Sequence, residues 1–201
     1  MMGEVAIVEE FLMGLDAEVA QLRRGDSSGL AALVARYQNR LYRYLLRLLR
    51  EPASAEDLFQ QTWVRVAQGI KQYDPRRSFE AWLFRVARNL AIDHLRRYRP
   101  ESLDAPLPSG ELPAGNLAAP DPGAFQALLA GERARRVAQA LEGLPVIHRE
   151  VLTLRFEEEM KLEEIAEVLE IPLSTVKSRL RRALDALRGL LLAELPEQEW
   201  R

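Results

Sequence analysis

The chain has 201 residues, of which 48% are hydrophobic and 29% are charged, and its formal net charge at pH 7 is -2. This length accommodates one or two small domains with a packed core. No apolar run approaches the roughly 18 residues of a membrane span, and no cysteine is present to form a disulfide framework or a thiolate metal site. Glu4, Glu9 and Glu10 interrupt the apolar N-terminal stretch, which argues against a signal peptide. We therefore expect a cytoplasmic protein without membrane insertion.

The first fifty residues show helical periodicity. A short helix is expected at 16–24, and Gly25-Asp26 ends it. Ser27 or Ser28 is a candidate cap for a second helix, whose apolar positions recur toward one side from Leu30 to Leu48. Five arginines lie along another face of this helix, and we expect them to be solvated: Arg36, Arg40, Arg43, Arg47 and Arg50.

A third helix is predicted after the break at Glu51-Pro52. Ser54 and Asp57 have the spacing of a capping box, although Asp replaces the commoner Glu or Gln. Apolar positions from Phe59 to Ile70 keep the helical period and predict a buried side. The opposite face is polar, and solvent exposure is its simplest explanation.

Aromatic and basic residues alternate through the loop and helix at 73–97. Tyr73, Phe79 and Trp82 lie among Arg76, Arg77 and several further arginines. Such a mixture is typical of single-stranded nucleic-acid binding, because every base offers a face for stacking and every phosphate a charge. The alternative is that the aromatic residues fill a core, so only those near the loop are candidates for contact with bases.

The composition changes between Pro100 and Gly123, where six prolines, three glycines and four acidic residues occur without a basic one. This predicts a flexible acidic linker at 100–124. The fold class is therefore all-α, with two small helical domains at 1–99 and 125–201. Further helices are expected at about 125–142 and 148–156.

The C-terminal domain carries two amphipathic segments separated by Glu170-Ile171-Pro172. Leu162, Ile165, Ala166 and Leu169 give the first its buried stripe, and Val176, Leu180, Leu184 and Leu187 give the second its own. The first segment is acidic and the second is basic. This predicts a helix-turn-helix whose second helix fits a DNA major groove, although two helices joined by a tight turn also occur in ordinary helical bundles.

Three segments together resemble the extracytoplasmic-function (ECF, group 4) sigma factors of the sigma-70 family. They are AEDLFQQTWVRV at 55–66, YDPRRSFEAWLFRVARNLAIDHLRR at 73–97, and LPVIHREVLTLRF with LEEIAEVLEIPLSTVKSRLRRAL between 144 and 184. They occur in the family's order and spacing. The resemblance implies a sigma factor that binds core RNA polymerase, directs it to promoters and helps to open the minus-ten DNA.

The resemblance also implies roles for residues in the first domain, at 1–99. The AEDLFQQ helix is expected to bind the clamp helices of the polymerase largest subunit through Asp57, Gln60, Gln61 and Arg65. The loop and helix at 73–97 are expected to recognise and melt the minus-ten element and to capture an unpaired base. The matching residues are Arg76, Arg77, Ser78, Phe79, Trp82, Arg85, Arg88, Asn89 and Arg96.

For the second domain the resemblance implies recognition of the minus-thirty-five duplex and contact with the polymerase flap. The residues expected nearest DNA are Ser174, Thr175, Lys177, Ser178, Arg181 and Arg182. The acidic linker is expected to thread toward the polymerase active-site cleft, and an anti-sigma factor is an expected partner. Glu170 stands where the family usually has Gly in the turn, so a slightly reshaped turn is expected. Ser174 also stands where Gly is frequent.

No enzymatic activity is expected. His94 and His148 are isolated from one another and from other candidate ligands, so no catalytic site, metal site or cofactor is predicted. The main alternative is a helix-turn-helix transcriptional regulator that is not itself a sigma subunit. An adaptor or anti-sigma protein that binds polymerase is a second alternative.

Overall fold

The computed structural model describes residues 14–98 and 135–193, and every regular element in these two ranges is helical. The described chain forms two compact units, which we treat separately. The predicted all-α class is confirmed. The predicted linker at 100–124 lies outside the described residues. Within the described ranges, no helix is long and apolar enough to cross a membrane.

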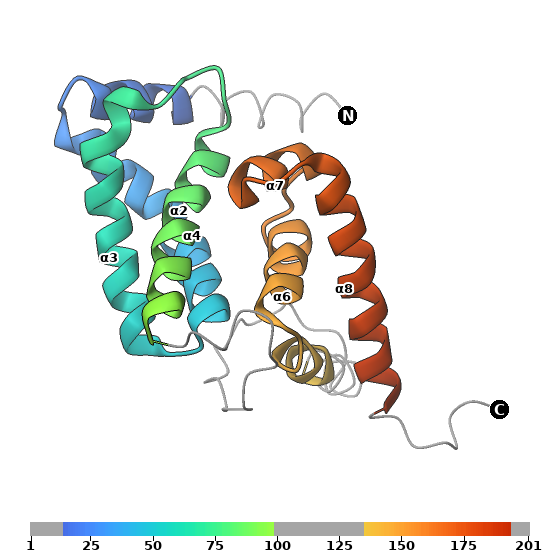
Figure 1. The fold of residues 1–201 in the computed structure, drawn as a ribbon. Coiled ribbons are helices and arrows are strands. Elements are labelled where there is room, and N and C mark those ends of the chain that lie inside the picture. The colour runs from blue at the N-terminus through green and yellow to red at the C-terminus, as the bar shows by residue number, and fades with distance from the viewer. Residues whose placement is uncertain (1–13, 99–134, 194–201) are drawn as a thin grey trace, which may run out of the picture. The chain divides into compact units, whose positions relative to one another are not determined.

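The first unit contains a helix at 14–23 followed by α2 (Ser27–Leu49), α3 (Pro52–Gly69), the 3-10 turn η1 (Ile70–Gln72) and α4 (Phe79–Tyr98). The helices α2, α3 and α4 run side by side (Figure 1). Their facing sides form a core that is rich in leucine and aromatic rings. Its fully buried members include Leu33, Leu41, Tyr44, Leu45, Leu48, Val66, Leu83 and Phe84. Tyr44 and Phe84 meet edge to face, with ring centroids 5.1 Å apart, which joins α2 to α4.

Two predicted helix starts are corrected by the structure. The N-cap of α2 is Asp26, whose carboxylate accepts a hydrogen bond from the Ser28 amide at 2.9 Å, so neither serine is the cap. At α3 the helix begins at Pro52, two residues before the predicted Ser54 cap. Proline suits a first helical position because its missing N–H has no partner to lose there. Ser54 instead donates to the Glu51 carboxylate at 2.6 Å.

Two of the arginines predicted to be solvated instead hold the first unit together. Arg36 forms a two-bond ion pair with Glu18 of the first helix, at 2.9 and 2.7 Å. Arg40 pairs in the same forked way with Glu80, at the start of α4. Both pairs are partly buried, and their fork geometry fixes orientation as well as charge. The basic face of α2 therefore fixes its two neighbouring helices.

The second unit contains a helix at 135–142, α6 (Val146–Leu152), the π-helical turn η2 (Thr153–Glu157), α7 (Leu162–Leu169) and α8 (Leu173–Ala193). The helix predicted at 148–156 therefore begins earlier and ends in a wider turn. Helix α6 packs along α8. Leu144, Val146, Val151, Ile165 and Val176 are buried in this unit.

A tight turn joins α7 to α8, as predicted for a helix-turn-helix. Glu170 keeps the left-handed backbone angle, with φ of 54°, and its N–H bonds to the Ala166 carbonyl. The Ile171 N–H also bonds to that carbonyl, at 3.2 Å, so the expected reshaping of this turn is not observed. One core prediction for α8 was wrong: Leu184 is 41% exposed, and its neighbour Ala183 takes the buried position.

Candidate nucleic-acid interface

The loop between η1 and α4 is fixed by hydrogen bonds at both ends of Tyr73. The Tyr73 carbonyl accepts from Arg23 at 3.3 Å, and its hydroxyl donates to the Arg77 carbonyl at 2.5 Å. Burial raises the pKa of Tyr73 to about 12, and the nearby carboxylates of Asp16 and Asp74 add to the effect. The hydroxyl therefore stays protonated at neutral pH and remains a hydrogen-bond donor. These contacts tie Tyr73 to the first helix through Arg23 and to the far end of the loop through Arg77.

Three aromatic rings meet behind this loop. The ring centroids of Tyr73 and Trp82 are 5.2 Å apart. The Phe79 centroid lies 5.6 Å from that of Tyr73 and 5.8 Å from that of Trp82. Phe79 also packs on Tyr37 of α2. Phe79 is only 3% exposed, whereas Trp82 is partly exposed. Of the two aromatic residues predicted to face DNA, Trp82 has surface available for stacking, and Phe79 supports it from beneath.

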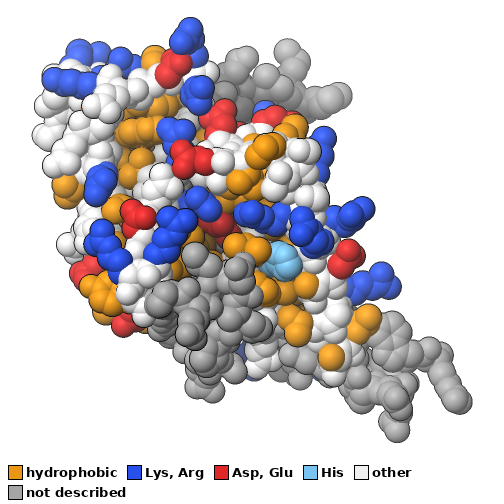
Figure 2. All heavy atoms as spheres, in the orientation of Figure 1, with side chains coloured by type: hydrophobic (Ala, Val, Ile, Leu, Met, Phe, Trp, Pro, Cys, Tyr) orange, Lys and Arg blue, Asp and Glu red, His pale blue; other side chains and the backbone are white. Residues whose placement is uncertain are grey.

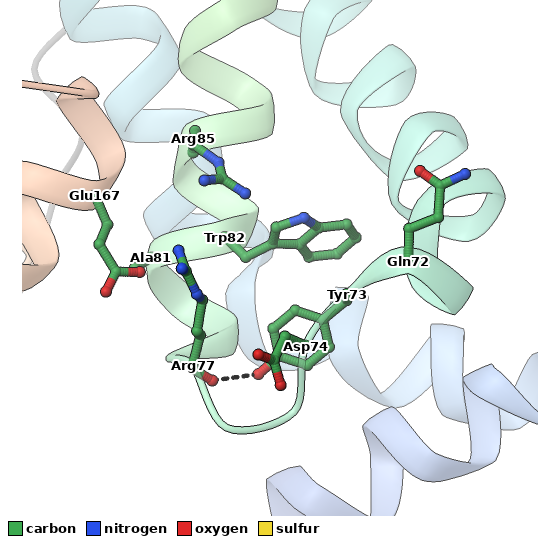
Figure 3. Close-up of a pocket in the computed structure, with 8 residues that line it drawn as sticks. All are labelled: Gln72, Tyr73, Asp74, Arg77, Ala81, Trp82, Arg85 and Glu167. Atoms are coloured by element: carbon green, nitrogen blue, oxygen red, sulfur yellow. Dashed lines mark hydrogen bonds between the residues drawn. The ribbon is translucent and has the colours of Figure 1, made fainter.

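Polar and charged side chains of the first unit lie around this aromatic wall. They are Gln72, Asp74, Arg77 and Arg85. Figure 3 shows the Trp82 indole between the Tyr73 ring and the Arg85 side chain in that view, with Arg77 at the edge of the loop. A flat apolar surface beside two guanidinium groups offers stacking for a base and charge for its phosphates. Gln72 and Asp74 were not among the predicted site residues. Gln72 precedes the motif at 73–97, and Asp74 stands in the motif but was not assigned a role.

The remaining predicted minus-ten residues fall into two groups. Ser78 caps α4, because its hydroxyl oxygen accepts from the Ala81 N–H at 3.2 Å and its carbonyl from the Trp82 N–H at 3.1 Å. Arg76 and Arg77 are exposed in the loop. Along α4, Trp82, Arg85, Asn89 and Arg96 share one face at helical spacing, while Arg88 lies to its side. The predicted residues therefore form a strip that begins at the loop and continues along the helix.

In the second unit, the predicted minus-thirty-five residues lie within about the first three turns of α8. Ser174, Lys177, Ser178 and Arg181 recur at the spacing that places them on one face. Arg182 lies beside this face and bonds back to Ser178, from Nε to its carbonyl and from Nη2 to its hydroxyl, both at 3.3 Å. Ser174, Lys177, Arg181 and Arg182 are exposed, and Thr175 and Ser178 are partly so. Figure 2 shows Lys and Arg side chains spread along α8.

His148 of α6 lies within the electrostatic influence of the same basic helix. Burial lowers its pKa, and the positive charges of Arg182 and Arg179 lower it further. Its Nδ1 is buried without a hydrogen-bond partner. His148 is therefore neutral at physiological pH, and the positive charge of this region comes from the arginines and Lys177.

The polar face of α3 is exposed, as predicted, and it has an apolar centre. Asp57, Gln60, Gln61 and Arg65 all face solvent. Val64 lies among them, seven residues after Asp57, and is 55% exposed. The motif did not single out Val64, although its helical spacing from Asp57 and Gln60 places it on this face. An apolar side chain surrounded by polar groups has the core-and-rim layout of a protein interface.

Comparisons with protein families place both units in one family. The Sigma-70 region 2 model matches residues 33–101, and the model for Sigma-70, region 4 matches residues 140–189. The first match contains α3, the loop and α4, and the second contains the helix-turn-helix. The two matches together cover more than half of the chain.

Relatives and solved structures agree with these matches. The ECF RNA polymerase sigma factor SigW of Bacillus subtilis is 32% identical over 182 residues, which cover 89% of this chain and 97% of SigW. The RNA polymerase sigma-H factor of Pseudomonas aeruginosa is 31% identical over 182 residues, which cover 89% of this chain and 94% of that factor. The structure of CnrH in complex with the cytosolic domain of CnrY matches with a TM-score of 0.66 at 28% identity, over 90% of this chain and 99% of CnrH.

Proposed function

Since the chain belongs to the extracytoplasmic-function group of the sigma-70 family and is an RNA polymerase sigma factor, we propose that its two helical units divide promoter recognition between them. The first unit binds core polymerase and captures the opened minus-ten strand. The second unit binds the minus-thirty-five element as duplex. Polymerase supplies the catalysis, and this chain supplies promoter choice.

The observation that carries this proposal is the partly exposed Trp82 beside Arg77 and Arg85. The Trp82 ring is held from behind by Tyr73 and Phe79, so little conformational entropy is lost when a base stacks on it. Duplex DNA has no unstacked base to offer, whereas a melted strand does. A surface that binds only unpaired bases lowers the free energy of the open state relative to the closed one. This is how the first unit promotes melting without covalent chemistry.

The strip along α4 extends this contact. Arg85, Arg88, Asn89 and Arg96 follow one another over about three turns of the helix, which suits a strand whose phosphates run along the helix axis. Arg76 and Arg77 add charge at the loop, and Ser78 holds the start of the helix. We assign these residues to the minus-ten strand, with Phe79 acting through the Trp82 ring.

The face of α8 suits the major groove of the upstream element. Ser174, Lys177 and Arg181 project from the exposed N-terminal part of the helix, the part that meets base edges when a recognition helix enters a groove. Arg182 is held by Ser178 and lies to the side, which suits a phosphate contact. Thr175 and Ser178 add short hydroxyl donors to the same surface.

The exposed face of α3 is the proposed contact with the polymerase clamp helices. Asp57, Gln60, Gln61 and Arg65 surround Val64, which gives an apolar centre with a polar rim. We place the flap contact in the second unit. A regulatory partner is also proposed, because CnrH has been solved in complex with the cytosolic domain of CnrY. That partner would act as an anti-sigma factor.

Run-off transcription tests the proposal. The full chain is mixed with core polymerase, and the complex is isolated by size exclusion and then given templates with and without a candidate promoter. A sigma factor yields a promoter-dependent transcript of defined length. A conventional helix-turn-helix regulator would bind DNA without associating with core polymerase, and an adaptor would associate with it without initiating. Either of those results would contradict the proposal.

A further inference from the structure

The Asp74 carboxylate, just outside the predicted site residues, is fully engaged with Arg76. Its Oδ1 accepts from the Arg76 backbone N–H and from Nε, both at 3.0 Å, and its Oδ2 accepts from Nη2 at 2.9 Å. The Arg76 side chain is nevertheless 88% exposed. One forked edge of this guanidinium is therefore occupied by a residue two positions away.

The pair changes the charge that the loop presents to DNA. Arg76 and Arg77 are adjacent, and Asp74 offsets one of the two charges. Hydrogen bonds from the side chain and the backbone N–H of Arg76 lower the pKa of Asp74 to about 2. Asp74 is therefore ionised throughout the physiological pH range, and the offset does not depend on pH.

The pair is also easily opened. Exposed ion pairs typically contribute about 0.2–1 kcal/mol to stability, so little is lost when they separate. The Nε and Nη2 edge occupied by Asp74 is one that also fits a phosphate in a forked, two-bond contact. A strand held against Trp82 for other reasons brings its phosphate to this edge at high local concentration, whereas passing DNA does not.

We propose that Asp74 is a specificity-determining residue that acts as the internal counter-ion of Arg76. The ion pair keeps the Arg76 guanidinium from binding the phosphates of arbitrary DNA. It opens when a strand is captured at the Trp82 ring, and a phosphate of that strand then binds Arg76. The proposal rests on the minus-ten role of this loop stated above. It goes further by assigning discrimination against non-promoter DNA to a residue of opposite charge to the DNA-binding arginines.

The test is Asp74→Asn, because Asn keeps the oxygen that accepts the Arg76 N–H and removes the charge. Holoenzyme carrying this variant is titrated with non-promoter duplex and with a single-stranded oligonucleotide at several salt concentrations. Because the Arg76 guanidinium is then free to bind a phosphate, non-promoter binding should tighten on the order of 3–10-fold near 0.1 M salt. The slope of log affinity against log salt should steepen by about 0.9 for duplex and 0.7 for single strand. The ratio of promoter to non-promoter affinity should fall.

Asp26→Asn is the matched control. Asp26 is another exposed aspartate whose carboxylate accepts a backbone N–H two residues later, at 2.9 Å, and the substitution changes net charge equally. It carries no forked arginine contact of the Asp74 kind. A salt slope for Asp74→Asn equal to that of Asp26→Asn would overturn the proposal, as would weaker non-promoter binding. Asp74→Asn combined with Arg76→Ala should return the slope to its original value.

A second pair of variants leaves Asp74 in place. Arg76→Ala removes a charge that Asp74 already offsets, so it should change the salt slope of non-promoter binding little. Arg77→Ala should reduce that slope by close to the value of one phosphate contact, about 0.9 for duplex. Equal reductions would contradict the counter-ion role even if Asp74→Asn folds poorly. Failure of the proposed function can be told apart from failure of the counter-ion role. In the first case the unmodified chain would give no promoter-dependent transcript in the run-off assay.

Discussion

The two proposed DNA-binding surfaces are built in opposite ways. On α8, Ser174, Lys177 and Arg181 share a face because of helical geometry. The hydrogen bonds of Ser178 with Thr175 and Arg182 stay within one turn of the same helix. At the loop, Tyr73, Ser78 and Trp82 are held by hydrogen bonds and ring contacts from several elements. One surface is a row of independent side chains, and the other is a connected assembly.

This difference has a consequence for mutation. Substitutions on the exposed face of a helix act mainly on the contact that each side chain makes, so their effects should be local. Substitutions at the loop change the position of neighbours, because Tyr73, Phe79 and Trp82 support one another. We therefore expect the largest functional losses at the loop and smaller, sequence-dependent losses on α8.

The largest effect is expected for Trp82→Ala. Base stacking on an aromatic ring contributes about 1–3 kcal/mol, which corresponds to roughly 5–150-fold in the opening equilibrium, and the ring also supports the loop. Permanganate footprinting should show a weak bubble at the minus-ten element, while binding of the closed duplex stays near the original value.

Trp82→Phe is the control for this prediction, because it keeps an aromatic face against Tyr73 and Phe79. Circular dichroism of both variants checks that α4 remains folded. A normal bubble with Trp82→Ala would mean that the ring does not hold an unpaired base, and the comparison between the two surfaces would lose its main support.

Arg181→Ala tests the independent character of the α8 face. If Arg181 contacts a base, its loss should cost about 1–3 kcal/mol and relax preference at one promoter position. Gel-shift titrations against a set of upstream-element variants measure both effects. Arg188→Ala, two turns further along α8 and also exposed, is the matched control and should leave preference unchanged. Unaltered binding of Arg181→Ala across the whole set would contradict the base contact.

Val64→Glu tests the third surface, on α3. Because Val64 is 55% exposed, the substitution should leave folding unchanged. An unpaired carboxylate buried in a protein contact costs at least about 1–3 kcal/mol, so affinity for core polymerase should fall roughly tenfold or more. Val64→Thr has a similar shape and should cost less. Size-exclusion binding at matched concentrations measures both, and equal affinities for the two variants would remove Val64 from the interface.

The smallest effect is expected at the turn between α7 and α8. Glu170 has a φ of 54°, an angle that costs a residue with a Cβ on the order of 1 kcal/mol relative to Gly. Glu170→Gly should therefore raise the stability of the second unit by up to about 1 kcal/mol in urea unfolding. Glu163→Gly, within α7, should instead lower it by about 1 kcal/mol. Stabilities that change in the same direction would show that the backbone angle is not the cause.

Much of the fold followed from the sequence because helical periodicity is a local signal. The buried sides of α2 and α3, the turn at Glu170 and the polar face around Asp57 all came from spacing. The starts of α2 and α3 did not, because serines near Asp26 and Pro52 are also suitable residues for a helix start. The backbone geometry that decides where each helix begins is not contained in the pattern.

The site was less predictable than the fold. The motif identified Arg76 and Trp82, but it gave no sign that Asp74 binds Arg76 or that Phe79 is buried beneath Trp82. Helical periodicity predicted that Arg36 and Arg40 are solvated, although each pairs with a glutamate at least 18 positions away in sequence. Such contacts join segments distant in the chain, and one sequence does not specify them.

The position of Trp82 also gives the protein an optical reporter. The chain has three tryptophans, Trp63, Trp82 and Trp200, and Trp63 is buried while Trp82 lies partly exposed against Tyr73. A base stacked on the Trp82 indole would quench its emission. With Trp63 and Trp200 replaced by Phe, the intrinsic fluorescence of the chain would therefore follow strand capture in real time, without an added dye.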